Sequence, residues 1–168
     1  MLSLVLTALF NLSLDTLHEV AHETLHDKIP LEYVSTLSNQ DQTDALRACL
    51  LVYILSSSTI IPRIFQLQAS LATLNGNDTI ITAGTGCGKT LCLLIPLLLR
   101  PGTISLTISP LKRLQTTQVR LCHSSHASHW CVLYLQVTES RKYGISTIAI
   151  NEDTPSDPAL WQVSYLVY

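Results

Sequence analysis

The sequence predicts an α/β fold, in which a parallel sheet with flanking helices follows a set of N-terminal helices. A glycine-rich turn at residues 84–90 lies between a β-branched run, residues 78–83, and an apolar run that continues to residue 99. This is the pattern of a strand, a loop and a helix. A second β-rich run, residues 103–109, precedes a helix that begins at Pro110. Alternating strands and helices with short connections form parallel sheets with right-handed crossovers.

The composition suits one globular domain with a real core. The 168 residues are 47% hydrophobic and 13% charged, and the mean hydropathy is +0.32. The net charge of −2 leaves no excess of positive charge for binding nucleic acid. This lack of positive charge argues against a complete nucleic-acid enzyme but not against part of one. Five cysteines without a Cys-x-x-Cys pair favour a reducing compartment. Because there is neither a transmembrane-length apolar run nor a signal-peptide pattern, we expect a soluble intracellular protein.

Residues 1–61 are predicted to form a helical N-terminal extension. Ser13 is a suitable N-cap for a helix that begins at Leu14, and residues 31–40 have the composition of a polar linker. Apolar spacing predicts two further helices, over residues 43–55 and residues 62–74. The apolar helix after the glycine-rich turn contains Pro96, which should kink or shorten it.

The first helix carries the pattern H-E-x-x-H, from His18 to His22, with His26 on the same face. Two histidines four residues apart can hold zinc, with Glu19 as a base. A third ligand and a substrate cleft are also needed, and nothing nearby supplies them. A solvated helix face is therefore the favoured interpretation.

The segment that begins at Ala83 or Gly84 and ends at Thr90 fits the phosphate-loop pattern G-x-x-x-x-G-K-[ST], when the first glycine is allowed to shift by one residue. Glycines let successive N–H groups turn toward a phosphate, and the following helix N-terminus adds partial positive charge. Lys89 would reach the β- and γ-phosphates of a nucleotide, and the Thr90 hydroxyl would ligate Mg²⁺. The alternative is a glycine turn without a ligand. The predicted loop residues are Gly84, Thr85, Gly86, Cys87, Gly88, Lys89 and Thr90.

Cys87 occupies a variable position of this loop, beside Lys89 and next to a helix N-terminus. That setting favours a reactive thiol, which Mg-ATP would protect from alkylation. An inert small residue is the equally weighted alternative.

Three blocks together resemble the first RecA-like domain of superfamily 2 helicases of the DEAD/DEAH type, and most of all RecQ-like DNA helicases of fungi. The blocks are the segment Pro62-Arg63-Ile64-Phe65-Gln66, the phosphate loop, and the segment that begins Ser109-Pro110-Leu111-Lys112-Arg113. The resemblance covers about residues 61–118 and 141–162. It implies an incomplete RecA-like P-loop NTPase domain over residues 62–168.

The resemblance also implies roles for single residues. Arg63, Phe65 and Gln66 would hold adenine, and ATP with Mg²⁺ would be the cofactor. Residues of the third block would contact single-stranded or forked DNA, mainly through phosphates, and a nuclear location follows from that substrate. The implied nucleic-acid contacts are Ser109, Pro110, Lys112, Arg113 and Gln118.

The sequence departs from the family in lacking an Asp-Glu-x-His block, which holds Mg²⁺ and positions the attacking water. The run from Asn151 to Asp153 follows a predicted strand, but its order is wrong for that block. We therefore expect ATP binding without hydrolysis or unwinding by this chain alone.

The likeness is also interrupted over residues 121–140 and stops at residues 163–168. Zinc binding is one interpretation of the interrupting segment, although its spacing follows no zinc-finger pattern. Translated intron is the favoured interpretation, and the genomic codons of Val119 and Val163 test it, because each should begin a splice-donor sequence. The zinc candidates are Cys122, His123, His126, His129 and Cys131.

The sequence thus favours the ATP-binding part of a RecQ-like helicase. Another P-loop protein, such as a small kinase or a GTPase, is the first alternative, although no guanine-reading Asn-Lys-x-Asp block occurs. A degenerate or mispredicted product without a stable fold is the second alternative, since an incomplete sheet would expose apolar edges.

Overall fold

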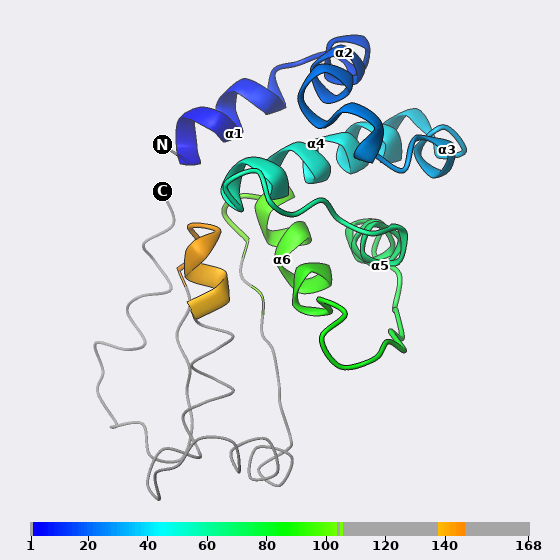
Figure 1. Ribbon diagram of the computed structural model, residues 1–168. Coiled ribbons are helices and arrows are strands. Elements are labelled where there is room, and N and C mark those ends of the chain that lie inside the picture. The colour runs from blue at the N-terminus through cyan, green and yellow to red at the C-terminus, as the bar shows by residue number, and fades with distance from the viewer. Residues whose placement is uncertain (1, 104, 106–137, 147–168) are drawn as a thin grey trace, which may run out of the picture. The chain divides into compact units, whose positions relative to one another are not determined.

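The computed structural model of the chain describes residues 2–103, 105 and 138–146. Within residues 2–103 its elements are α1 (Leu2–Phe10), α2 (Leu14–Leu25), the 3-10 turn η1 (His26–Lys28), α3 (Leu31–Val34), α4 (Asn39–Leu55), α5 (Ile64–Leu74) and α6 (Thr90–Leu99) (Figure 1). The chain divides into two compact units, and all of these elements belong to the first, Met1–Pro101 with Lys142–Gly144. No helix in the described ranges is long and apolar enough to cross a membrane.

Serine caps begin the two long N-terminal helices. The Ser13 hydroxyl accepts a hydrogen bond from the Thr16 backbone N–H at 3.3 Å, which confirms the predicted start of α2 at Leu14. The Ser38 hydroxyl accepts from the Asp41 N–H at 3.2 Å. This cap starts α4 at Asn39, four residues before the predicted position.

The predicted polar linker over residues 31–40 is wrong, because α3 and the first turn of α4 occupy much of it. Polar side chains that looked like linker composition instead close the end of α3. The Ser35 hydroxyl donates to the Glu32 carbonyl at 3.0 Å, and the Thr36 hydroxyl donates to the Tyr33 carbonyl at 2.7 Å. Short polar side chains satisfy helix ends as readily as they solvate a linker.

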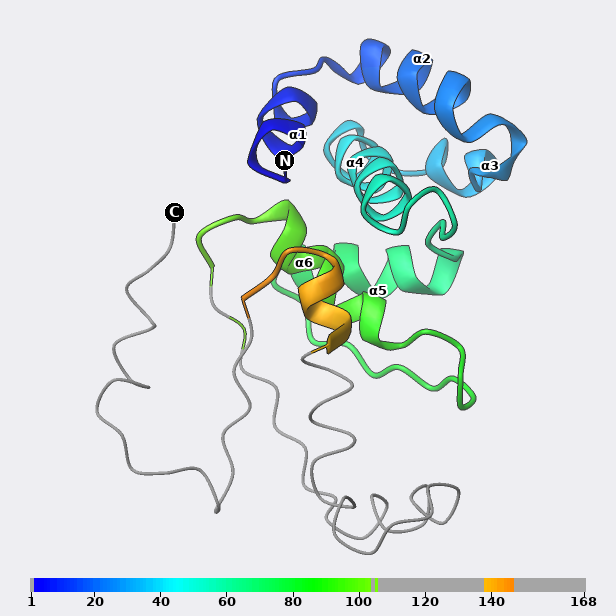
Figure 2. The same cartoon turned by 60° about the vertical axis from the view of Figure 1, so that its left-hand side comes forward.

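Helix α4 is the centre of the first unit. It contacts α1, α2, α3, α5 and α6, and in both views it lies between α2 on one side and α5 and α6 on the other (Figures 1 and 2). Burial therefore extends around most of this helix rather than along one stripe. It raises the pKa of the Cys49 thiol to about 12. The buried apolar residues of α4 are Ala45, Leu46, Ala48, Cys49, Leu50, Leu51 and Val52.

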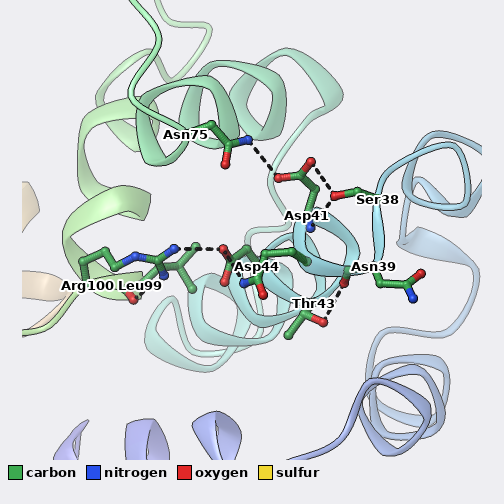
Figure 3. Close-up of polar contacts among 9 residues, drawn as sticks. Ser38, Asn39, Asp41, Thr43, Asp44, Asn75, Leu99 and Arg100 are labelled. Carbon is green, nitrogen blue, oxygen red and sulfur yellow. Dashed lines mark hydrogen bonds and ion pairs between the residues drawn. The ribbon is translucent and has the colours of Figure 1, made fainter.

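Polar side chains connect α4 to its neighbours. Arg47 donates to the Leu9 and Phe10 carbonyls at 3.2 and 2.9 Å, and its guanidinium lies 4.9 Å from the centre of the Phe10 ring. These contacts satisfy the C-terminal carbonyls of α1. Asp44 forms an ion pair with Arg100 at 3.2 Å, at the end of α6 (Figure 3).

Asp41 connects the first turn of α4 to the end of α5. The Asp41 carboxylate accepts from Ser38 at 2.8 Å and from Asn75 at 3.0 Å (Figure 3). Asn75 and Gly76, whose φ is +76°, end α5 where the sequence predicts. Helix α5 begins at Ile64 instead of the predicted Pro62, since residues 62 and 63 precede its first turn.

Pro96 lies inside α6, which nonetheless continues to Leu99. Proline has no N–H, so the carbonyl of Cys92, four residues earlier, loses its helical donor. The Ser70 hydroxyl on α5 donates to that carbonyl at 3.5 Å, and Ser70 is 1% exposed. A neighbouring helix therefore supplies the missing hydrogen bond.

The described residues contain no strand, which corrects the strand predicted over residues 78–83. Residues 78–83 are irregular, and the Ile80 side chain is 95% exposed. A β-branched segment forms a strand only where a neighbour takes up its backbone hydrogen bonds. Most of the second predicted strand, residues 103–109, lies outside the described residues. The described part of the chain is helical, and the parallel sheet of the predicted α/β class is absent from it.

Candidate nucleotide-binding site

The glycine-rich loop depends on left-handed backbone conformations. Gly86 and Gly88 have φ values of +80° and +77°, which residues with a Cβ adopt only at a cost. A Cβ placed on Gly88 would lie 2.8 Å from Nε2 of Gln66, whereas one on Gly86 would meet nothing within 4 Å. A side chain at residue 88 would therefore strain the backbone and would also displace the end of the Gln66 side chain from the loop. The loop ends directly at the first turn of α6, which begins at Thr90.

Lys89 closes the loop on itself. Its ammonium group donates to the Ala83 carbonyl at 2.8 Å and to the Gly84 carbonyl at 2.7 Å. The Cys87 N–H donates to the same Gly84 carbonyl at 3.4 Å. The lysine side chain is exposed, so a phosphate group can compete for its ammonium group.

Gln66 connects the first turn of α5 to the loop. Its side-chain oxygen accepts from the Arg63 N–H at 2.7 Å, and its Nε2 donates to the Gly88 carbonyl at 2.8 Å and the Cys87 carbonyl at 3.3 Å. The side chain is 3% exposed. Both of its N–H groups are thus engaged by the loop. Reading an adenine edge, the role that the sequence implies, would require this amide to exchange partners.

Arg63 and Phe65 line a shallow open groove of about 470 Å³. Arg63 is exposed and Phe65 is half-buried. The other lining residues are Lys28 at the end of η1 and Ile29 and Pro30, which precede α3, and no motif marks them in the sequence. The groove is lined by Lys28, Ile29, Pro30, Ile61, Pro62, Arg63, Ile64 and Phe65.

The H-E-x-x-H histidines do not form a metal centre in the described ranges. His18 Nε2 lies 3.4 Å from the side-chain oxygen of Gln42 on α4, and His22 is exposed. Within these ranges, no group of three His, Cys, Asp or Glu side chains could hold a metal ion. His18 instead takes part in the packing of α2 on α4.

The remaining predicted site residues lie outside the described residues. They are the nucleic-acid candidates Ser109, Pro110, Lys112, Arg113 and Gln118, and the zinc candidates Cys122, His123, His126, His129 and Cys131. The structure therefore brings together the loop and Gln66, and places Arg63 and Phe65 at the neighbouring groove.

Known proteins are similar to the segment of the chain that contains Gln66 and the glycine-rich loop. The family model described as DEAD/DEAH box helicase matches residues 63–151, more than half of the chain. The chain is 44% identical over 55 residues to "ATP-dependent DNA helicase Q-like 5" of Arabidopsis thaliana, and 43% identical over 49 residues to "RecQ-like DNA helicase blm-1" of Caenorhabditis elegans.

The two matches cover 33% and 29% of this chain but only 6% and 5% of the relatives. No solved structure matches the chain. The family match begins at Arg63 and contains both Gln66 and the glycine-rich loop. The chain belongs to the DEAD/DEAH box helicase family, with its similarity to RecQ-like helicases confined to a short part of those proteins.

Proposed function

We propose that this chain binds Mg-ATP on the loop of residues 84–90, as part of a RecQ-like, ATP-dependent DNA helicase. The observation that carries the proposal is the loop geometry. Gly86 and Gly88 adopt left-handed conformations directly before a helix N-terminus, and the Lys89 ammonium group lies over the start of the loop. This combination of turned backbone, helix dipole and lysine suits a phosphate chain. DEAD/DEAH helicases, the family to which the chain belongs, bind ATP, usually with Mg²⁺.

The residues present suit this ligand. Lys89 already donates to two carbonyl oxygens, and phosphate oxygens are stronger acceptors for the same ammonium group. The Thr90 hydroxyl stands at the first position of α6 and would ligate Mg²⁺, which neutralises phosphate charge when bound. Arg63 would contact the base through its guanidinium plane.

The family implies nucleic-acid binding, and we propose single-stranded or forked DNA as the partner, with a nuclear location. The third block supplies the contacts in this proposal, mainly from Ser109, Lys112 and Arg113 to phosphates. Binding of that kind is weakly sequence-specific and weakens with salt. Because the sequence has no Asp-Glu-x-His block, we expect this chain to hold ATP without hydrolysing it.

Binding of Mg-ATP to the purified chain, measured by calorimetry, tests the proposal. We expect Lys89→Ala to abolish measurable binding, whereas Lys142→Ala, which changes an exposed lysine elsewhere, should leave it unchanged. Competition by GTP separates a helicase-type site from a GTPase. Equal binding by wild type and Lys89→Ala would refute the loop as the site.

Thermal unfolding with and without Mg-ATP separates this proposal from a degenerate product without a stable fold. A ligand at about 100 times its Kd stabilises the folded state by about 2.7 kcal/mol. We expect a cooperative transition that moves to higher temperature with Mg-ATP in the wild type only. A chain without a cooperative transition would support the degenerate product instead.

Alkylation of Cys87 gives an independent readout of the loop. Cys87 is half-buried, whereas Cys49 and Cys92 are buried. A thiol reagent should therefore modify Cys87 first among these three, and Mg-ATP should slow that reaction. Equal labelling of Cys87 with and without Mg-ATP would contradict nucleotide binding at the loop.

A further inference from the structure

The groove beside the loop has two walls from different parts of the chain. One wall is the segment 61–65, which leads into α5, and the other is the segment 28–30, between η1 and α3. The family match begins at Arg63, so the second wall lies outside it. Both walls belong to the same compact unit.

The lining of the groove is apolar, with charges of one sign only. Apolar side chains from both segments form most of it, and the charged side chains among its lining residues are the two cations, Lys28 and Arg63. Both cations are exposed. An apolar surface with positive charge at its edge suits a ligand that has a flat, uncharged ring and an anionic group, because the ring is removed from water while the anion is paired with a cation. A volume of about 470 Å³ is in the range of small-molecule sites.

Hydrogen bonds link one residue of the groove lining, Arg63, to the glycine-rich loop. The Arg63 N–H donates to the Gln66 side chain, and the same amide donates to the Cys87 and Gly88 carbonyls. One residue that lines the groove is therefore linked to the loop through a single side chain.

We propose that residues 28–30 form a second wall of the base site, so that the N-terminal segment helps to bind the nucleotide base. This inference rests on the proposed function, because it takes the occupant of the groove to be the base of ATP. Pro30 and Ile29 supply apolar surface to the ring, and Lys28 supplies positive charge to the same anionic ligand.

The test compares binding of Mg-ATP with binding of inorganic tripolyphosphate, which has no base. Pro30→Trp fills the groove and retains the Pro30 carbonyl that accepts from the Val34 N–H. We expect it to weaken Mg-ATP binding by about tenfold and to leave tripolyphosphate binding unchanged. Ile54→Trp, a substitution at an exposed residue outside the groove, is the matched control and should change neither.

A charge reversal provides the second variant, which tests the second wall of the base site if Pro30→Trp does not fold. We expect Lys28→Glu to weaken Mg-ATP binding by more than Lys142→Glu, which makes the same change of charge at an exposed lysine outside the groove. Circular dichroism confirms that each variant is folded.

The outcomes separate this inference from the proposed function. If Pro30→Trp and Lys28→Glu bind Mg-ATP as their controls do, while Lys89→Ala binds neither ligand, the second wall is wrong and the loop remains the phosphate site. If the wild type binds neither Mg-ATP nor tripolyphosphate, the proposed function fails and the base site fails with it.

Discussion

The α4 region and the glycine-rich loop are held in opposite ways, although they belong to one compact unit. Helix α4 is surrounded by other helices, and its Leu46, Leu50 and Leu51 are almost fully buried. The segment from residue 77 to residue 89 is irregular and largely exposed, and Ile80 extends almost entirely into solvent. Its shape relies on hydrogen bonds from Gln66 and Lys89 to backbone carbonyls.

Because of this difference, we expect α4 to determine the stability of the chain and the loop to determine ligand binding. Apolar burial contributes to the free energy of unfolding in proportion to the area removed from water, whereas a few exposed hydrogen bonds contribute little to it. Substitutions in α4 should therefore change stability without changing the loop. Substitutions at the loop should change ligand binding more than stability.

The largest expected effect on stability comes from the centre of α4. Leu50→Ala removes a side chain that is 1% exposed, and it should lower the free energy of unfolding by about 3 kcal/mol because a cavity remains. Urea unfolding followed by circular dichroism measures this change. Ile54→Ala, at a residue 40% exposed on the same helix, should cost less than about 1 kcal/mol. Equal costs at the two positions would contradict the central role of α4.

Alanine substitutions at two glycines separate the effect of backbone strain from that of a contact with the Gln66 side chain. Gly76 and Gly88 have φ values of +76° and +77°, but only a Cβ at Gly88 would meet the Gln66 side chain, at 2.8 Å. Each alanine variant should lose about 1 to 2 kcal/mol of stability. Gly88→Ala should also lose Mg-ATP binding in calorimetry, while Gly76→Ala should keep it. Loss of binding in both variants would show that general destabilisation is responsible.

High pH should destabilise the chain through Cys49. Burial raises the pKa of this thiol from 9.0 to about 12, so the thiol ionises more readily in the unfolded state. Its contribution to stability is complete below about pH 9 and is lost as the pH rises toward 12. At pH 10 the loss is about 1 kcal/mol. Urea unfolding across this range should show a shallower loss for Cys49→Ala than for the wild type, and identical slopes would contradict the assignment.

The smallest expected effect concerns the bond from Ser70 to Cys92. Ser70→Ala leaves the Cys92 carbonyl without a donor, which should cost about 1 kcal/mol. In the Pro96→Ala background the helix supplies its own N–H to that carbonyl, so Ser70→Ala should cost less there. A double-mutant cycle measures this difference. Additive costs would show that Ser70 does not compensate for the proline.

Local sequence signals were sufficient for several elements of the fold and the site. The Ser13 cap, the end of α5 at Asn75 and Gly76, and the start of α6 at Thr90 all depend on residues within one turn of each other. The glycine pattern likewise indicates where the backbone must turn. Such features can be predicted from the sequence because their interacting groups are neighbours in the chain.

Other elements depended on partners far away in the sequence. The strand predicted over residues 78–83 did not form in the described part, because a strand takes its hydrogen bonds from another segment. The contacts of Gln66 with the loop join residues 21 and 22 positions apart. The groove joins residues 28–30 to residues 61–65, and no motif marks the first of these segments.

The sequence by itself determined that a glycine-rich loop precedes an apolar helix and that helices precede both. The tertiary structure decided that Gln66 binds the loop backbone, that Ser70 satisfies the carbonyl left open by Pro96, and that the N-terminal segment reaches the groove beside Arg63. The physical reason is the range of each interaction. Caps and turns are satisfied within a few residues, whereas buried polar groups and grooves take their partners from whichever helix packs against them.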